Sequence, residues 1–340
     1  MHIHWNTDVM MGIGNMLGYR RLNINLRNAM MRLGTVLDAD SEVSVQVRSP
    51  DMYAPVPGKI NAWFTMFESS GMPSFIIENL KKADALIVPS KYCVEIFRPH
   101  TEVPIFVVPL GVDPSLFTLV KRSYPKDRPF RWLWIGAKNT RKGWNAVIDV
   151  WNMDGPRGKM VENPGLELYL KTTDDDLTIQ HQKNAHLDTR LIGDKELVGL
   201  YHSAHAFVFP TMSEGYGLTA AEAMATGLPC VTPLHTGIVD FANAQICYPV
   251  RHGRAEIMVD SPALAHAGSK FLAPVFPVDQ EDLYRQMWNV MDRYTQALIV
   301  GFYASKRMSQ FTWGASAIVM LGALRSLKNG KNADIMKEAS

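Results

Sequence analysis

A strand, a glycine turn and a helix follow one another at residues 206–225, and this order constrains the fold more than any other feature. The apolar run at 206–210 predicts a buried strand, and the alanine-rich run from 219 predicts a helix. Glu214 and Glu222 flank the turn, with seven residues between them. Glycines that lead into a helix N-terminus present backbone amides to an anion. Carboxylates beside them can accept hydrogen bonds from hydroxyls, so the segment predicts a ligand with phosphate and sugar groups.

Strand-like apolar runs alternate with helical stretches along most of the chain. Alternation of this kind predicts α/β structure with parallel sheets, and 340 residues are enough for about two domains. A basic stretch with two prolines begins at Lys121 and has the composition of a linker. We therefore expect a first domain at 1–120, a linker at 121–130, a second domain at 131–300 and a helical segment at 301–340.

A helix is also expected near the N-terminus, after a glycine loop. Leu26, Met30, Leu33 and Leu37 follow helical spacing, although Gly34 interrupts the run. The loop at 12–14 precedes this helix and again presents amides to an anion or a hydroxyl.

Residues 131–144 form a second strand-to-loop segment, which carries positive charge. An apolar run predicts a strand that ends at Gly136, and Lys138, Arg141 and Lys142 follow it. Cations at such a place stabilise a phosphate leaving group as it gains negative charge. On this segment alone, a solvated basic turn remains an alternative interpretation.

The two segments together resemble the retaining glycosyltransferases of the two-domain GT-B fold, the glycosyl transferases group 1 or family four, which carry an E-x7-E signature. The Pro-Ser run at 82–91 and the Gly-Val-Asp run at 107–117 resemble parts of that family's first domain. The resemblance implies an α/β fold with two Rossmann-like domains, whose parallel sheets face each other across a cleft. It also implies a C-terminal helix that crosses back to the first domain.

The resemblance assigns the donor site to the E-x7-E segment. Glu214 would contact the transferred sugar, and Glu222 would contact the nucleotide ribose hydroxyls. The backbone amides near the donor would belong to Gly215, Tyr216, Gly217 and Leu218.

The diphosphate is assigned to the basic segment. Lys142 matches the family pattern, but Ala137 stands where the family commonly has arginine. Lys138 or Arg141 can supply the missing charge, and the sequence does not decide between them. We expect Lys142 and Arg141 to act in the transfer together with Glu214.

Two residues of the first domain complete the expected site. Gly14 lies in the glycine loop that borders donor and acceptor in the family. Glu68 ends a strand-like run, where a carboxylate points into the ligand-binding end of an α/β sheet and can orient an acceptor hydroxyl. An ordinary ion pair with a nearby cation is the alternative for Glu68.

The function implied is transfer of a sugar from a nucleoside diphosphate sugar, UDP- or GDP-linked, to an acceptor hydroxyl. The family works with retention of anomeric configuration, without an essential metal and without a further cofactor. The run Asp174–Asp176 favours a solvated loop over a metal site. Two alternatives remain, a sugar-phosphate phosphorylase or epimerase on the same fold, and a non-catalytic protein that binds nucleotide or glycan.

The charge and the cysteine content of the chain limit the partners and the cellular compartment that we expect. A net charge of +2 does not favour nucleic acid as a partner. The acceptor is left open among a glycan, a lipid-linked glycan, a protein, a small molecule and a modified DNA base. Three scattered cysteines indicate a reducing compartment. Because no signal peptide or membrane-spanning run is visible, we expect a cytoplasmic protein, with peripheral membrane contact left open.

Overall fold

The computed structural model describes residues 1–6, 17–69, 71–173, 183–260 and 270–330. Its contacts divide the chain into two compact units. The first unit comprises Met1–Gly111, Asp260–Ala273 and Phe311–Ser340, and the second comprises Val112–Val259 and Pro274–Gln310.

The first unit is built on a six-stranded sheet whose pairings are all parallel. The strands lie in the order β2-β1-β3-β4-β5-β6. Their bounds are His2–Trp5 (β1), Val36–Leu37 (β2), Val43–Val47 (β3), Ile60–Phe64 (β4), Ala85–Val88 (β5) and Ile105–Val107 (β6). Strands such as β3 and β5 are buried along their whole length, as expected for a parallel sheet covered on both faces.

Four described helices belong to the first unit, and three of them follow strands or loops in the expected βα order. Their bounds are Leu17–Arg32 (α1), Ser74–Leu80 (α2), Lys91–Phe97 (α3) and Trp313–Lys328 (α9). The helix expected to include Leu37 is shorter than its apolar spacing suggests. Gly34 adopts a left-handed φ of 81° just after α1 ends, and Leu37 lies in β2.

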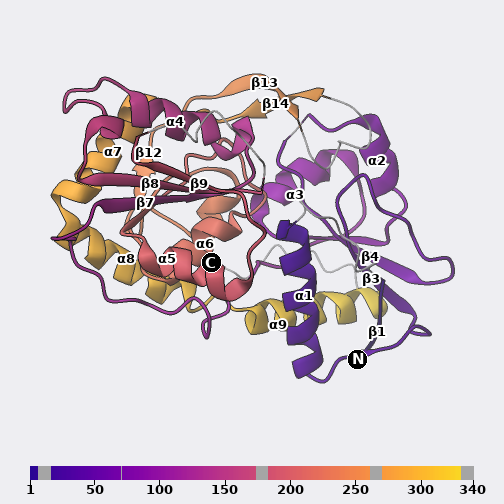
Figure 1. Ribbon diagram of the computed structural model, residues 1–340. Helices are drawn as coiled ribbons and strands as arrows, with labels where there is room; N and C mark the ends of the chain where they lie inside the picture. Colours follow the sequence, from indigo (N-terminus) through magenta and orange to yellow (C-terminus); the bar gives the residue numbers. More distant parts are fainter. Residues whose placement is uncertain (7–16, 70, 174–182, 261–269, 331–340) are drawn as a thin grey trace. The chain divides into compact units, whose positions relative to one another are not determined.

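Helix α9 packs against α1 within the first unit (Figure 1). Ser316 Oγ donates a hydrogen bond of 2.6 Å to the carbonyl oxygen of Pro109, and Lys328 Nζ lies 2.7 Å from a carboxylate oxygen of Glu42. At Gly111, a Cβ atom would lie only 2.1 Å from the backbone nitrogen of Trp313. The expected return of the C-terminal helix to the first domain is therefore confirmed.

The second unit holds another six-stranded parallel sheet, in the order β12-β11-β10-β7-β8-β9. The strand bounds are Phe130–Ile135 (β7), Leu166–Lys171 (β8), Ala185–Asp188 (β9), Ala206–Val208 (β10), Cys230–Pro233 (β11) and Tyr248–Val250 (β12). Counted along the unit, this order is 3-2-1-4-5-6 from β9 to β12, which is the dinucleotide-binding Rossmann topology. Successive strands are added on one side of β7 up to β9 and on its other side from β10 to β12, so the direction in which strands are added reverses between β7 and β10.

Helices cover both faces of this second sheet, and Figure 1 shows α4 on one face and α5, α6 and α8 on the other. The helix bounds are Trp144–Asn152 (α4), Asp194–Ser203 (α5), Leu218–Ala225 (α6), Gln280–Asp292 (α7) and Tyr294–Met308 (α8). Strands β13 (Ala255–Asp260) and β14 (Lys270–Val275) pair as a separate ribbon. The prediction of two Rossmann-like parallel-sheet domains with a helical C-terminal segment is confirmed.

Arg122, in the stretch expected to be a linker, is anchored inside the second unit. Its guanidinium donates to the carbonyl oxygens of Ala204, Tyr201 and Thr226, at 3.1, 3.0 and 2.6 Å. Burial lowers the pKa of Arg122 to about 10. Because these carbonyls lie in or just after the last turns of α5 and α6, the cation caps both helices. In the described part of the chain, no helix is both long and apolar enough to cross a bilayer.

Candidate functional site

The two sequence segments with opposite charge meet at the carboxyl end of the second sheet. Residues Thr140–Lys142 form a short 3-10 turn after β7, and Glu214 follows β10. Strands β7 and β10 are neighbours at the point where the strand order changes direction. Ligands of open α/β sheets bind at such a switch point, at the carboxyl ends of the strands.

Glu214 is buried, with 4% of its surface exposed, and cations compensate its charge. Lys142 Nζ donates to both carboxylate oxygens, at 2.6 and 2.8 Å. Thr211 Oγ1 lies 3.0 Å from Oε1, and Arg141 Nη1 lies 3.7 Å from the same oxygen. Arg141 Nη1 also donates to the carbonyl oxygen of Ser213, at 2.6 Å.

The electrostatics of Glu214 are a balance between burial and these cations. Burial by itself raises the pKa of the carboxyl group, because the charged form loses its hydration. Lys142 and Arg141 outweigh that effect, so the pKa of Glu214 lies below its ordinary value. The site therefore holds an ionised carboxylate beside two cations at neutral pH.

Two glycines allow the loops to approach each other. Gly143 has a φ of 74°, and a Cβ atom there would lie 2.1 Å from the carbonyl oxygen of Pro210. The backbone N–H of Met212 donates to the carbonyl oxygen of Arg141, at 2.7 Å. Gly217 has a φ of 102° and precedes α6, where a Cβ atom would lie 2.3 Å from Ile238. Gly143 thus lets the loop of Lys142 approach the loop of Glu214, and Gly217 lets the turn before α6 approach Ile238.

Glu222 lies on α6 and is 2% exposed. The hydroxyl of Tyr201, on α5, lies 3.0 Å from Oε2 of Glu222. The same hydroxyl lies 3.2 Å from the carbonyl oxygen of Thr219 in the first turn of α6. The second carboxylate of the motif is therefore oriented by a buried tyrosine from the neighbouring helix.

The glycine turn between the two glutamates is buried as well. Tyr216 is 1% exposed, and its ring centroid lies 5.1 Å from that of Phe241. Burial raises the pKa of the Tyr216 hydroxyl above its ordinary range. Gly215 packs against Gly237, and Leu218 begins α6. Tyr216 thus anchors the turn through its side chain.

The remaining predicted residues lie in other places. Lys138 is half-buried in the loop between Gly136 and Asn139, before the 3-10 turn. Glu68 belongs to the first unit and follows β4, and its carbonyl oxygen accepts a hydrogen bond of 3.1 Å from the hydroxyl of Tyr92. Gly14 lies outside the residues that the structure describes.

A sequence model of the glycosyl transferases group 1 family matches residues 157–273, about a third of the chain. The matched residues include Tyr201, Glu214 and Glu222. Residues 157–273 are therefore similar to the glycosyl transferases group 1 family. Lys142 and Arg141 precede this segment, so the family match does not include them. Their position beside Glu214 is known from the structure of the second unit.

Curated relatives match about half of the chain. The chain is 26% identical over 205 residues to mannosylfructose-phosphate synthase of Agrobacterium fabrum, covering 55% of this chain and 38% of that protein. It is 29% identical over 192 residues to glycogen synthase of Mycobacterium tuberculosis, covering 53% of this chain and 45% of that protein. The match therefore spans less than half the length of each relative.

Solved structures show the same fold over nearly the whole chain. Sucrose-phosphate synthase from Thermosynechococcus elongatus has a TM-score of 0.66 at 16% identity, covering 96% of this chain and 99% of that one. Pneumococcal O-GlcNAc transferase, in complex with UDP and GlcNAc, has a TM-score of 0.54 at 13% identity, covering 89% and 59%. Together with the two Rossmann-like sheets, these likenesses establish the GT-B fold class.

Three side-chain contacts around the two glutamates were not predicted from the sequence. Thr211 supports Glu214, Tyr201 supports Glu222, and Thr236 Oγ1 accepts a hydrogen bond of 3.0 Å from the backbone N–H of Glu214. Thr211 follows β10 closely, so its place at a strand's carboxyl end was a usable signal. The contact of Tyr201 with Glu222 and that of Thr236 with Glu214 gave no such signal, because they depend on how α5 and the residues after β11 pack.

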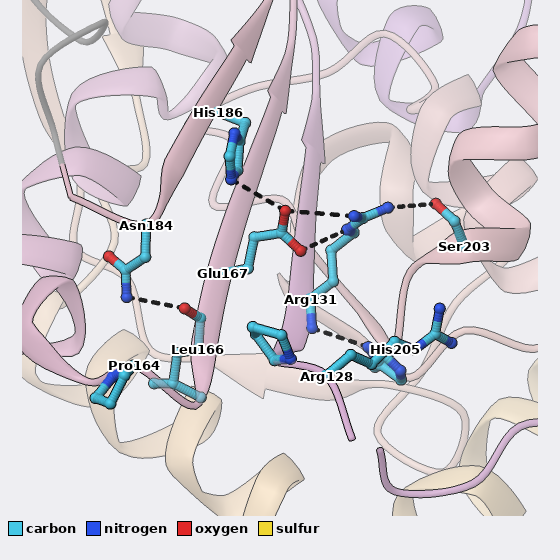
Figure 2. Close-up of a pocket in the computed structure, with 10 residues that line it drawn as sticks. Arg128, Arg131, Pro164, Leu166, Glu167, Asn184, His186, Ser203 and His205 are labelled. Atoms are coloured by element: carbon cyan, nitrogen blue, oxygen red, sulfur yellow. Dashed lines mark hydrogen bonds and ion pairs between the residues drawn. The ribbon is translucent and has the colours of Figure 1, made fainter. Parts of the chain in front are cut away.

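A pocket of about 280 Å³ lies at the opposite, amino end of the same sheet (Figure 2). Arg131 Nε and His186 Nε2, which line it, lie 2.8 and 3.1 Å from the carboxylate oxygens of Glu167. The backbone N–H of Arg131 donates to Nδ1 of His205, and burial lowers the pKa of that imidazole to about 4. At this end of the sheet Glu167 is therefore paired with Arg131 within the sheet itself.

Among the described residues, no group of three or more His, Cys, Asp or Glu side chains is arranged to hold a metal ion. The acidic run Asp174–Asp176, expected to form a solvated loop, lies outside the described residues.

Proposed function

We propose that this chain is a glycosyltransferase that moves a sugar from a nucleoside diphosphate sugar to an acceptor hydroxyl. The observation that carries this proposal is the ion cluster of Glu214, Lys142 and Arg141 at the switch point of a Rossmann sheet. The family match and the names of the curated relatives support a glycosyltransferase. The O-GlcNAc transferase of the same fold, solved with UDP, supports a nucleotide-linked donor.

In this proposal the two cations hold the diphosphate. An ammonium group has three N–H donors, so Lys142 can contact Glu214 and a phosphate oxygen at the same time. Negative charge grows on the phosphate oxygen as the bond to the anomeric carbon breaks. Fixed cations in a site with little water stabilise that charge, and this term is commonly large in enzymes.

The glutamates would hold the two other parts of the donor. Glu214 would accept a hydrogen bond from a hydroxyl of the transferred sugar, and Glu222 would accept one from the ribose. Tyr201 fixes the Glu222 carboxylate before the donor binds, which reduces the entropy lost on binding. Gly14, Lys138 and the turn amides from Gly215 to Leu218 would complete the donor contacts.

The proposed reaction retains the anomeric configuration and needs no metal ion. The acceptor oxygen bonds to the anomeric carbon on the face from which the phosphate departs. The acceptor proton passes to the departing phosphate oxygen, and Glu68 orients the acceptor hydroxyl. Lys142 and Arg141 supply the positive charge that a metal ion supplies in other transferases.

The proposal is tested by a thermal-shift screen of UDP- and GDP-sugars, followed by a nucleotide-release assay with candidate acceptors. We expect one donor to raise the melting temperature and to release nucleoside diphosphate when an acceptor is added. Turnover that requires free phosphate would instead indicate a phosphorylase, and interconversion of two donors would indicate an epimerase. Binding without turnover across all acceptor classes would indicate a non-catalytic protein.

A further inference from the structure

Thr236 has an unusual backbone conformation for its residue type. Its φ is 52°, and Asn184 is the one other non-glycine residue with positive φ in the part of the chain that is described. The left-handed region is unfavourable for β-branched residues, whereas asparagine tolerates it. Backbone strain of this kind persists only where surrounding contacts maintain it, and it concentrates at functional sites.

The contacts that maintain Thr236 are contacts to Glu214. Oγ1 of Thr236, which is 7% exposed, accepts a hydrogen bond of 3.0 Å from the backbone N–H of Glu214. The next residue, Gly237, donates its N–H to the carbonyl oxygen of Glu214, at 2.9 Å. Two consecutive residues after β11 therefore hold both backbone groups of Glu214.

A third residue orients the threonine hydroxyl. Nδ1 of His235 lies 3.1 Å from Oγ1 of Thr236. Burial lowers the pKa of His235 to about 4, so its imidazole is neutral at pH 7. A neutral imidazole nitrogen can accept the hydroxyl proton, which leaves the oxygen lone pairs of Thr236 for the N–H of Glu214.

The neighbouring positions show why a hydroxyl matters here. Position 237 has no room for a side chain, because a Cβ atom would lie 2.5 Å from the carbonyl oxygen of Gly215. Glycine at 236 would adopt the left-handed backbone without strain. It would also leave the buried N–H of Glu214 without its acceptor.

We propose that Thr236 is a positioning residue, whose hydroxyl fixes the peptide of Glu214 so that the carboxylate meets Lys142 and the transferred sugar. The inference rests on the proposed transferase function. It predicts that loss of the hydroxyl lowers kcat more than it changes the KM for the donor, because the carboxylate is displaced where the sugar reacts.

Three substitutions separate the hydroxyl from the backbone strain. Thr236→Val keeps the shape and the strain but removes the hydroxyl, and we expect kcat to fall roughly tenfold. Thr236→Gly removes both, and we expect a similar loss although the strain is relieved. Thr236→Ser keeps the hydroxyl, and we expect it to recover kcat to within about threefold of the unsubstituted chain.

Asn184→Gly provides a matched control. It relieves the other left-handed residue, whose side chain caps the carbonyl oxygens of Asn163 and Leu166 at the amino end of the sheet. We expect Asn184→Gly to shift the melting temperature without changing kcat. If Thr236 had a purely structural role, its variants would likewise shift the melting temperature and leave kcat unchanged.

A second readout tests the hydrogen bond directly. Amide hydrogen exchange of the peptide that contains Glu214 should be faster in Thr236→Val and Thr236→Gly than in the unsubstituted chain and in Thr236→Ser. If Thr236→Gly keeps full kcat and unchanged exchange, the inference is overturned while the transferase function stands. If the unsubstituted chain turns over no donor, the proposed transferase function is wrong. Unchanged amide exchange in Thr236→Val would then show independently that the Thr236 hydroxyl does not hold the peptide of Glu214.

Discussion

Glu214 and Asp188 are both buried carboxylates at the carboxyl end of the second sheet, but their ionic partners come from different distances along the chain. Asp188 ends β9 and bonds to Arg190, two residues further along the chain, through Nη2 at 2.8 Å. Tyr169, on the adjacent strand β8, donates its hydroxyl to the same carboxylate, at 2.9 Å. Glu214 instead takes its cations from the loop after β7, 72 residues earlier.

The difference separates a structural ion cluster from a candidate site. The Asp188 cluster lies at the end of β9, an edge strand, and its partners come from just after β9 or from the neighbouring strand β8. Lys171 also donates to the carbonyl oxygens of Thr172 and Asp188. The hydrogen bond from Arg190 is the main reason that the pKa of Asp188 lies below its ordinary range. Only the Glu214 cluster joins two strand-end loops at the switch point, so a buried ion pair by itself does not mark a site.

The largest effect is expected for Lys142→Ala. Removal of the cation should lower kcat about 100- to 1,000-fold, the range seen when one charge-stabilising group is lost. It should also cost about 3 kcal/mol of stability, because Glu214 remains buried without its partner. Steady-state kinetics and thermal unfolding measure the two effects. The double variant Lys142→Met/Glu214→Gln should recover stability but not turnover, and recovery of turnover would contradict the assignment.

Glu222→Ala should act on donor binding. Loss of a hydrogen bond to a charged group costs about 2 kcal/mol, which corresponds to roughly 30-fold weaker donor binding. Calorimetric titration with the donor found in the screen measures this change. Tyr201→Phe should produce a smaller change in the same direction, since it leaves the carboxylate in place but frees it. Unchanged donor affinity in both variants would remove Glu222 from the site.

Asp188→Asn should separate the two clusters. It should lower stability by about 1 to 3 kcal/mol, because a buried network loses a charged partner, and it should leave kcat within about twofold. Chemical denaturation and the nucleotide-release assay measure these quantities. Complete loss of turnover in a folded Asp188→Asn variant would show that the contrast drawn between Glu214 and Asp188 is wrong.

The smallest effect concerns acid stability. A carboxyl group whose pKa is lowered by folding contributes stability above its unfolded pKa of about 4, and the contribution is lost as the pH falls below that value. The pKa of Asp188 is lowered in this way. The stability difference between the unsubstituted chain and Asp188→Asn should therefore be largest at pH 6 and should shrink toward pH 3. Melting temperatures across this range provide the measurement, and a constant difference would contradict the assignment.

The sequence alone predicted two parallel-sheet domains and named Lys142, Arg141 and Glu214 as candidate site residues. Strands such as β5 and β10 are buried apolar runs, and the glycines at 143 and 217 mark turns that few other residues permit. The supporting contacts were not predictable. Tyr201 and Thr236 reach the glutamates across loops and helices, so only their packing identifies them. Leu37 was placed wrongly in a helix because its spacing continues past a glycine that ends α1.

The packing of α9 on α1 has a consequence for synthesis on the ribosome. The first unit begins at residue 1, but it also contains Trp313–Lys328, so it cannot assemble its full core until those residues have emerged. The second unit lies almost entirely between these segments and can fold earlier. Of the two units, the one whose residues emerge first is thus the last to be completed, and nascent chains that stall before α9 would expose the surface that this helix covers.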